Sequence, residues 1–163
     1  MSLIALAKSK GLYLAVAESL TGGQVTASLI DTPGASDVVL GGLVTYQDQL
    51  KEQLLGVSPQ LIAAQTAVDA EVAAQMAAGV REKLASKCQK AASSVIGIST
   101  TGAAGPDPVG IHLPGTVFIG LASERGVKVM AFNFEGNRES VRAQATDAAL
   151  SAIAEEIQLL NGL

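Results

Sequence analysis

Three polar segments of this sequence carry side chains that could do chemistry, and the first is the run from Glu18 to Gly23. In it Ser19 follows an apolar stretch and comes just before a helical pattern. A serine at a strand-to-helix junction lies where backbone N–H groups point into open space, so its hydroxyl could attack a carbonyl beside an oxyanion site. The alternative is structural: Ser19 or Thr21 caps the helix, and spacing alone favours the cap.

The second segment holds Thr45, Tyr46 and, five residues further on, Lys51. A lysine acts as a base near neutral pH only when its pKa is lowered by roughly 3 units, which requires burial or a cationic neighbour. The alternative is a solvated lysine paired with Asp48 or Glu52. Both interpretations of Lys51 remain open at the level of sequence.

The third segment combines the turn that contains Thr101 and Gly102 with the start of the last helical pattern. There Arg138 and Arg142 lie four residues apart, on one helical face, near the end where the helix dipole disfavours cations. A bound anion such as a phosphate would reverse that preference. Charge compensation by Glu139 is the alternative explanation.

Common site signatures are absent from the sequence. It has no P-loop, no dinucleotide-binding glycine motif after a strand and no HExxH motif. One cysteine, Cys88, and one histidine, His112, cannot form a Cys/His zinc cluster, so we expect no metal and no cofactor. A Ser-His-Asp triad would have to use His112, whose apolar neighbours favour a loop or partly buried histidine instead.

Composition excludes several classes of protein. Of the 163 residues, 48% are hydrophobic and 16% charged, against about 25% charged in an average domain, which excludes disorder. A net charge of −4 and 3% aromatic residues argue against nucleic acid as a partner. We expect a cytoplasmic protein with no membrane partner, because we find no export signal and no apolar run long enough to span a bilayer.

The elements that must position these residues alternate between strands and helices. This order predicts a single α/β domain over residues 1–163 with a mixed sheet between helical layers, and its 17 glycines and many alanines predict closely packed elements. The expected elements are a helix over 2–9, a strand over 12–17, a helix after Gly23, a strand over 38–46, a short helix with Lys51 that ends at Gly56, a long helix capped by Asp69, strands over 93–99, 116–122 and 127–134, with a tight hairpin at 123–126, and a last helix from Asn137.

Five runs occur together in a specific order and cover residues 4 to 155. They are 17–23 (AESLTGG), 44–46 (VTY) with Lys51 and 54–57 (LLGV), 101–106 (TGAAGP), 114–117 (PGTV), and 136–142 (GNRESVR). This combination resembles the C-terminal domain of the CinA competence/damage-inducible family. The resemblance implies a three-layer α/β/α fold with a mixed, mostly parallel sheet, and deamidation of nicotinamide mononucleotide to nicotinate mononucleotide and ammonia in bacterial pyridine nucleotide salvage.

The resemblance also implies roles for individual residues. Ser19 would be the nucleophile, with Lys51 and Tyr46 in proton transfer. Further residues would bind the substrate, a small-molecule nucleotide, and the protein would be a homo-oligomer. The substrate-binding set is Thr21, Gly22 and Gly23, with Thr101 and Gly102 as the other candidates for the oxyanion site, and Arg142, followed by Arg138, for the 5′-phosphate.

The chain departs from the family pattern at several positions. Asp48 stands where an asparagine is common, and Gly41 where an arginine often precedes the strand glycine. The runs 66–70 and 107–113 also differ from the usual motifs. Ser19 and Lys51 are unaffected, but a catalytically inactive nucleotide-binding module of the same family is the alternative function, and an assembly protein is a further one.

Overall fold

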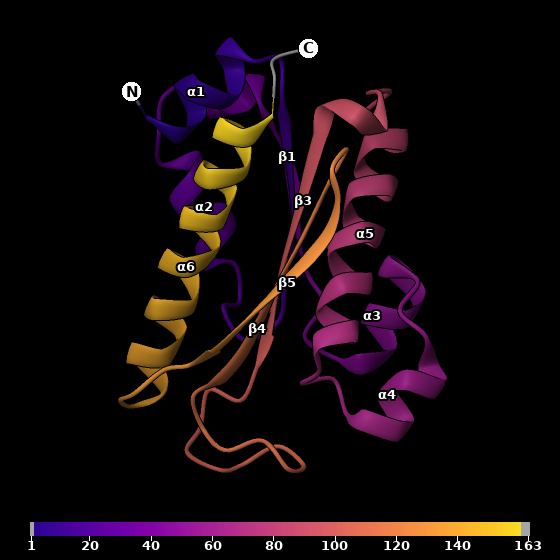
Figure 1. Ribbon diagram of the computed structural model, residues 1–163, viewed down its shortest axis with the longest axis vertical. Helices are drawn as coiled ribbons and strands as arrows, with labels where there is room; N and C mark the ends of the chain where they lie inside the picture. The colour runs from indigo at the N-terminus through magenta and orange to yellow at the C-terminus, as the bar shows by residue number, and fades with distance from the viewer. Residues whose placement is uncertain (1, 161–163) are drawn as a thin grey trace.

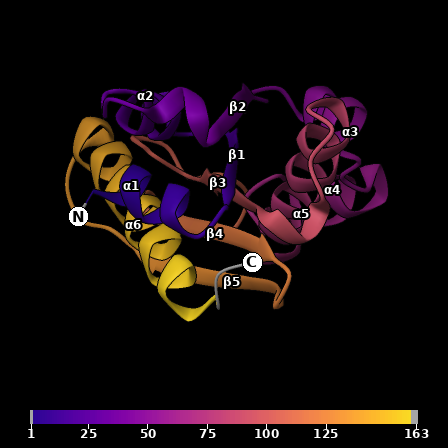
Figure 2. The ribbon, with the colours of Figure 1, turned by 90° about the horizontal axis from the view of Figure 1, so that it is seen from above.

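The computed structural model of the chain describes residues 2–160 (Figure 1). Its helices lie in two groups on opposite faces of a central sheet, as Figure 2 shows from above. The elements, in chain order, are α1 (Leu3–Ser9), β1 (Tyr13–Glu18), α2 (Gln24–Ile30), the 3₁₀ turn η1 (Ala35–Asp37), β2 (Val39–Val44), α3 (Asp48–Leu55), α4 (Pro59–Gln65), α5 (Ala70–Lys87), η2 (Ala92–Ser94), β3 (Val95–Gly102), β4 (Thr116–Ser123), β5 (Gly126–Asn133) and α6 (Arg138–Leu159).

Strand order defines a mixed sheet. Within residues 2–160 the sheet has five strands in the order β2-β1-β3-β4-β5. Strand β1 pairs in parallel with β2 and β3, whereas β4 pairs antiparallel with β3 and β5, so that in the described chain β4 alone runs opposite to the others. Helices α1, α2 and α6 cover one face and α3, α4 and α5 the other (Figures 1 and 2). The expected three-layer fold with a mixed, mostly parallel sheet is confirmed.

Small side chains bring α5 very close to the sheet, as the composition predicts. A Cβ added to Gly97 would lie 2.3 Å from the Ala77 carbonyl oxygen, and one added to Gly120 would lie 2.2 Å from that of Ala73. Both distances are far inside van der Waals contact, so α5 can pack at this depth only over glycine. The buried core of the described residues contains no aromatic side chain, and this close approach of backbones fills the space instead.

Capping signals placed the two long helices correctly. The Asp69 carboxylate accepts hydrogen bonds from the Glu71 and Val72 amides at the start of α5. Asn137 accepts from the Ser140 amide at the start of α6. The tight hairpin between β4 and β5 is also confirmed.

Other boundaries differ from the sequence-based prediction. The strand expected over 93–99 continues to Gly102, because Thr101 and Gly102 pair with β4 and therefore belong to the sheet, not to a turn. The strand expected over 38–46 ends at Val44. Helix α4 was not predicted, although Ser58 and Pro59 carry its start signals as N-cap and first helical residue.

Candidate active site

One cavity of about 470 Å³ lies beyond the carboxyl ends of β1, β2 and β3, at the end of the sheet that is lowest in Figure 1. It unites the three segments that the sequence singled out, since all three contribute to its wall. Ligands of α/β proteins commonly bind at this edge. The lining side chains and backbone that could act on a ligand belong to Ser19, Leu20, Tyr46, Asp48, Lys51, Thr101, Gly102, Asp107 and Arg138.

Ser19 follows directly after β1. Its amide donates to the Thr100 carbonyl oxygen, with 3.0 Å between N and O, so the pairing of β1 with β3 continues through this residue. The side chain is half-buried, and within residues 2–160 its hydroxyl makes no hydrogen bond. The Ser19 hydroxyl therefore lines the cavity without a structural role of its own.

Glu18, not Ser19 or Thr21, satisfies the start of α2. Its fully buried carboxylate accepts hydrogen bonds from the Gly23, Val25 and Thr26 amides at 2.9, 3.1 and 2.8 Å. The hydroxyls of Thr21 and Thr26 donate to the same carboxylate. The interpretation of Ser19 or Thr21 as the cap is wrong, because the carboxylate beside them takes these donors. The signal for this cap was an acidic residue at the end of an apolar strand.

Two of the expected oxyanion donors are already used. The Gly22 amide donates to the Ser19 carbonyl oxygen at 3.1 Å, and the Gly23 amide donates to Glu18. The Thr21 hydroxyl is buried between Glu18 and the Thr100 hydroxyl, 2.8 Å away. None of these residues lines the cavity, so the expectation that Gly22 and Gly23 donate to an oxyanion is wrong for this structure.

Lys51 is a buried amine. Its side chain is 1% exposed, and Nζ donates to the Tyr46 carbonyl oxygen at 3.1 Å and to Asp48 Oδ1 at 3.4 Å. Burial lowers the pKa of Lys51 from its ordinary value, and the Asp48 carboxylate partly opposes this. The solvated-lysine alternative is wrong about exposure and right about the pairing with Asp48.

The two arginines of α6 have different partners. Arg138 lines the cavity, where it donates to the Gly105 carbonyl oxygen at 2.8 Å and to the Tyr46 hydroxyl at 3.2 Å. Arg142 instead donates to the carbonyl oxygens of Leu20 and Thr21, at 2.8 and 3.1 Å, and supports the turn that carries Ser19. Of the two arginines, Arg138 is therefore the one that lines the cavity, and which of them binds a phosphate stays a prediction.

The end of β3 forms part of the cavity wall. The Thr101 hydroxyl donates to the Ala67 carbonyl oxygen at 2.6 Å, which fixes the segment between α4 and α5. The Ala103 amide donates to Thr116 on β4. Because successive amides of a strand point to opposite neighbours, the Gly102 amide points away from β4, to the side of β3 on which β1 lies.

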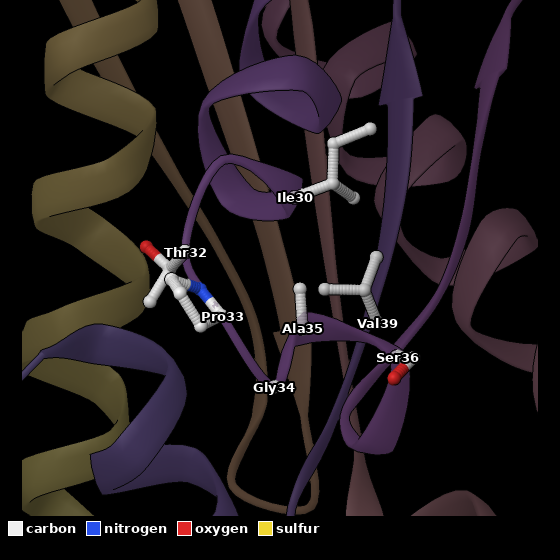
Figure 3. A pocket seen from close by; sticks show the side chains of 7 residues that line it. All are labelled: Ile30, Thr32, Pro33, Gly34, Ala35, Ser36 and Val39. Atoms are coloured by element: carbon white, nitrogen blue, oxygen red, sulfur yellow. The ribbon is translucent and has the colours of Figure 1, made fainter.

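The other hollows of the described chain do not include Ser19 or Lys51. Figure 3 shows one of about 360 Å³ at the far end of β2, with no charged side chain in its wall. The His112 ring packs edge-on against Phe118 and does not line the Ser19 cavity. Among residues 2–160 no cluster of His, Cys, Asp and Glu could hold a metal ion, and no helix is long and apolar enough to cross a membrane.

The fold and the cavity define an α/β protein with a serine and a buried lysine around one site at the carboxyl edge of its sheet. The chain matches the family model described as CinA C-terminal domain over residues 1–157. It therefore belongs to the CinA C-terminal domain family, as its motifs suggested.

Individual relatives agree with this assignment. The chain is 43% identical to a CinA-like protein of Geobacter sp. (strain M21) over 147 residues, which are 90% of the chain. It is 42% identical to a CinA-like protein of Geotalea daltonii over 153 residues, which are 93% of the chain. It spans about a third of the length of these curated relatives (34% and 35%). The crystal structure of the competence damage-inducible protein A of Klebsiella pneumoniae superposes with a TM-score of 0.84 at 25% identity, covering 99% of this chain and 100% of that one.

Proposed function

We propose that the chain is an amidohydrolase that converts nicotinamide mononucleotide and water to nicotinate mononucleotide and ammonia. The observation that carries the proposal is the shared cavity, which Ser19 and the buried amine of Lys51 line together. Hydrolysis of an amide requires an activated nucleophile, and a lysine whose pKa is lowered by burial is suited to activate one. The family resemblance implies the same reaction.

The proposed reaction has two halves. Ser19 Oγ attacks the carboxamide carbon while its proton passes to Lys51 Nζ, and the resulting tetrahedral intermediate expels ammonia, which takes the proton from Lys51. Water then attacks the acyl ester and gives one proton to Lys51, which passes it to Ser19 Oγ as the ester bond breaks. The nicotinate leaves as a carboxylate, and its remaining proton goes to the solvent. The Tyr46 hydroxyl, at the same cavity, assists in moving the proton.

Two backbone amides are suited to bind the developing oxyanion. The Leu20 amide directly follows the nucleophile, and within residues 2–160 it donates no hydrogen bond. Gly102 lines the same cavity as Ser19, and its amide lies on the β1 side of β3. Together they replace the Gly22 and Gly23 donors, and preorganised amides of this kind contribute about 3 to 4 kcal/mol to transition-state stabilisation.

Ammonia release from nicotinamide mononucleotide tests this proposal. Purified wild type is expected to release one ammonia for each nicotinate mononucleotide, measured by a coupled ammonia assay and by chromatography. Ser19→Ala is expected to lose more than about 1000-fold in kcat. Ser93→Ala, which changes an exposed serine just before β3, is the matched control and should behave as wild type.

A non-catalytic nucleotide-binding module is the competing function. Its signature in the same experiments is tight binding of nicotinamide mononucleotide by calorimetry without any product. Equal ammonia release by wild type and Ser19→Ala would exclude the serine mechanism, whereas absence of both binding and release would exclude the nucleotide as a ligand.

A further inference from the structure

The first turn of α3 contains an ion pair between one exposed and one buried side chain. Asp48 Oδ1 lies 3.4 Å from Lys51 Nζ, and the two side chains are 54% and 1% exposed. The carboxylate is thus in contact with solvent, whereas the amine is enclosed. A negative charge at this distance stabilises the ammonium form of the lysine, which cannot accept a proton.

The hydrogen-bond partners of Nζ hold the amine in place. Both the Tyr46 carbonyl oxygen and the Asp48 carboxylate are acceptors, so each contact needs an N–H of Lys51. The carbonyl belongs to the backbone and is fixed by the fold. The carboxylate is the partner whose charge a substitution can remove while its shape is kept.

Other titratable groups also surround Lys51, and the Tyr46 side chain opposes the lowering of the Lys51 pKa in the same direction as Asp48. Asp107, from the loop after β3, and Arg138, from α6, line the same cavity with opposite charges. On α3 itself, Glu52 forms no ion pair with Lys51 among the described residues. On α5, Glu71 accepts a hydrogen bond from Gln75, and Glu82 and Lys83 lie along a separate groove with Gln53 and Leu54.

We propose that Asp48 is a positioning residue for Lys51: its carboxylate holds Nζ in place and retains the proton on it, and so sets the lower pH limit of the reaction. This inference rests on the proposed function and makes Asp48 the residue that adjusts the pH range of this chain. The substitution Asp48→Asn would keep a hydrogen-bond acceptor at this position but remove the charge. Because Asp48 is half-exposed, salt would weaken its effect.

The test compares the pH dependence of kcat/KM in wild type, Asp48→Asn, Asp48→Glu and Glu52→Gln. Asp48→Asn should move the acid limb to lower pH by about 0.5 to 1 unit. A higher KCl concentration should move the acid limb of the wild-type profile to lower pH as well, and should leave the acid limb of Asp48→Asn nearly unchanged. Asp48→Glu should remain close to wild type, and Glu52→Gln, the neighbouring carboxylate, should not move the limb.

A ¹³C NMR titration of lysine side chains labelled at Cε provides a readout that needs no turnover. The pKa of Lys51 should be lower in Asp48→Asn than in wild type, because the opposite charge is gone. An unchanged Lys51 titration, or an equal shift in Glu52→Gln, overturns the proposal. If wild type releases no ammonia at any pH, the proposed function fails, and the NMR titration still decides whether Asp48 controls Lys51.

Discussion

The guanidinium of Arg138 donates a hydrogen bond to the Tyr46 hydroxyl, with 3.2 Å between Nη2 and Oη, although 92 residues separate them in the chain. A second bond, to the Gly105 carbonyl oxygen, ties the same guanidinium to the loop after β3. The first turn of α6 thus reaches the loop after β2 and the loop after β3 at one point. A phosphate at this point could accept the hydrogen bonds that Arg138 donates here to two neutral oxygens.

Arg138→Ala should therefore weaken binding of the nucleotide. Loss of a charge-assisted contact of about 1.5 to 3 kcal/mol corresponds to a roughly 10- to 100-fold rise in KM for nicotinamide mononucleotide, with a smaller change in kcat. Steady-state kinetics with nicotinamide riboside, which lacks the phosphate, provide the control. An equal loss with the riboside would mean that Arg138 acts through Tyr46 and not through a phosphate.

Removal of the buried amine should abolish turnover. Lys51→Met keeps the length and apolar stem of the side chain but cannot accept a proton, so kcat should fall by about 100- to 10,000-fold. Stopped assays across pH 6 to 10 would measure this loss. A Lys51→Met protein with near wild-type kcat at any pH in that range would contradict the assigned role.

The same substitution should change how stability depends on pH. The pKa of Lys51 is lowered by burial, so between that pKa and the ordinary value of 10.5 the unfolded chain binds more protons than the folded one. The free energy of unfolding of wild type should rise with pH across this window, and the contribution should vanish in Lys51→Met. Urea denaturation at several pH values measures it. Below the window Lys51→Met should be the more stable protein, by about 1 to 4 kcal/mol.

Local signals predicted much of the fold and the neighbourhood of the site. Asp69 and Asn137 mark helix starts because a side-chain cap depends on a few adjacent residues. The serine turn, the lysine segment and the arginines were found because polar residues at strand ends stand out against an apolar chain. Their meeting at one cavity follows from parallel strands, whose carboxyl ends share an edge.

The remaining features depend on contacts that sequence spacing does not encode. The cap of α2 comes from Glu18 because the end of β1 turns its carboxylate under the helix. Arg138 and Arg142 lie on one helical face, and only the rotation of α6 against the sheet decides which reaches the cavity. Lys51 is buried because α3 packs against α5, so its pKa depends on tertiary structure.

Glu18→Gln tests the buried cap. The carboxylate accepts five hydrogen bonds at the start of α2, and a neutral amide carries one acceptor oxygen and an NH₂ group that would face N–H donors. The variant should lose about 1 to 3 kcal/mol of stability in urea denaturation. Glu155→Gln, which changes an exposed carboxylate on α6, is the control and should change stability by less than about 0.5 kcal/mol.

Glu156, at the end of the sheet away from the cavity, should make the fold sensitive to acid. Burial alone would raise the pKa of Glu156, but hydrogen bonds from Ser123 (2.6 Å) and Lys128 (3.0 Å) outweigh burial and lower it. A lowered folded-state pKa means that its contribution is complete above the ordinary value of 4.5 and is lost as the pH falls through the folded-state value.

The stability advantage of wild type over Glu156→Gln should therefore be about 0.5 to 1.5 kcal/mol near pH 7 and should shrink steadily below pH 4.5. The figure is modest because Lys128 and Arg125 are 40% and 53% exposed and solvent screens their charges. Thermal denaturation from pH 7 to pH 3 measures the difference. A difference that stays constant or grows on acidification would show that the Glu156 carboxylate does not stabilise the hairpin of β4 and β5 through its charge.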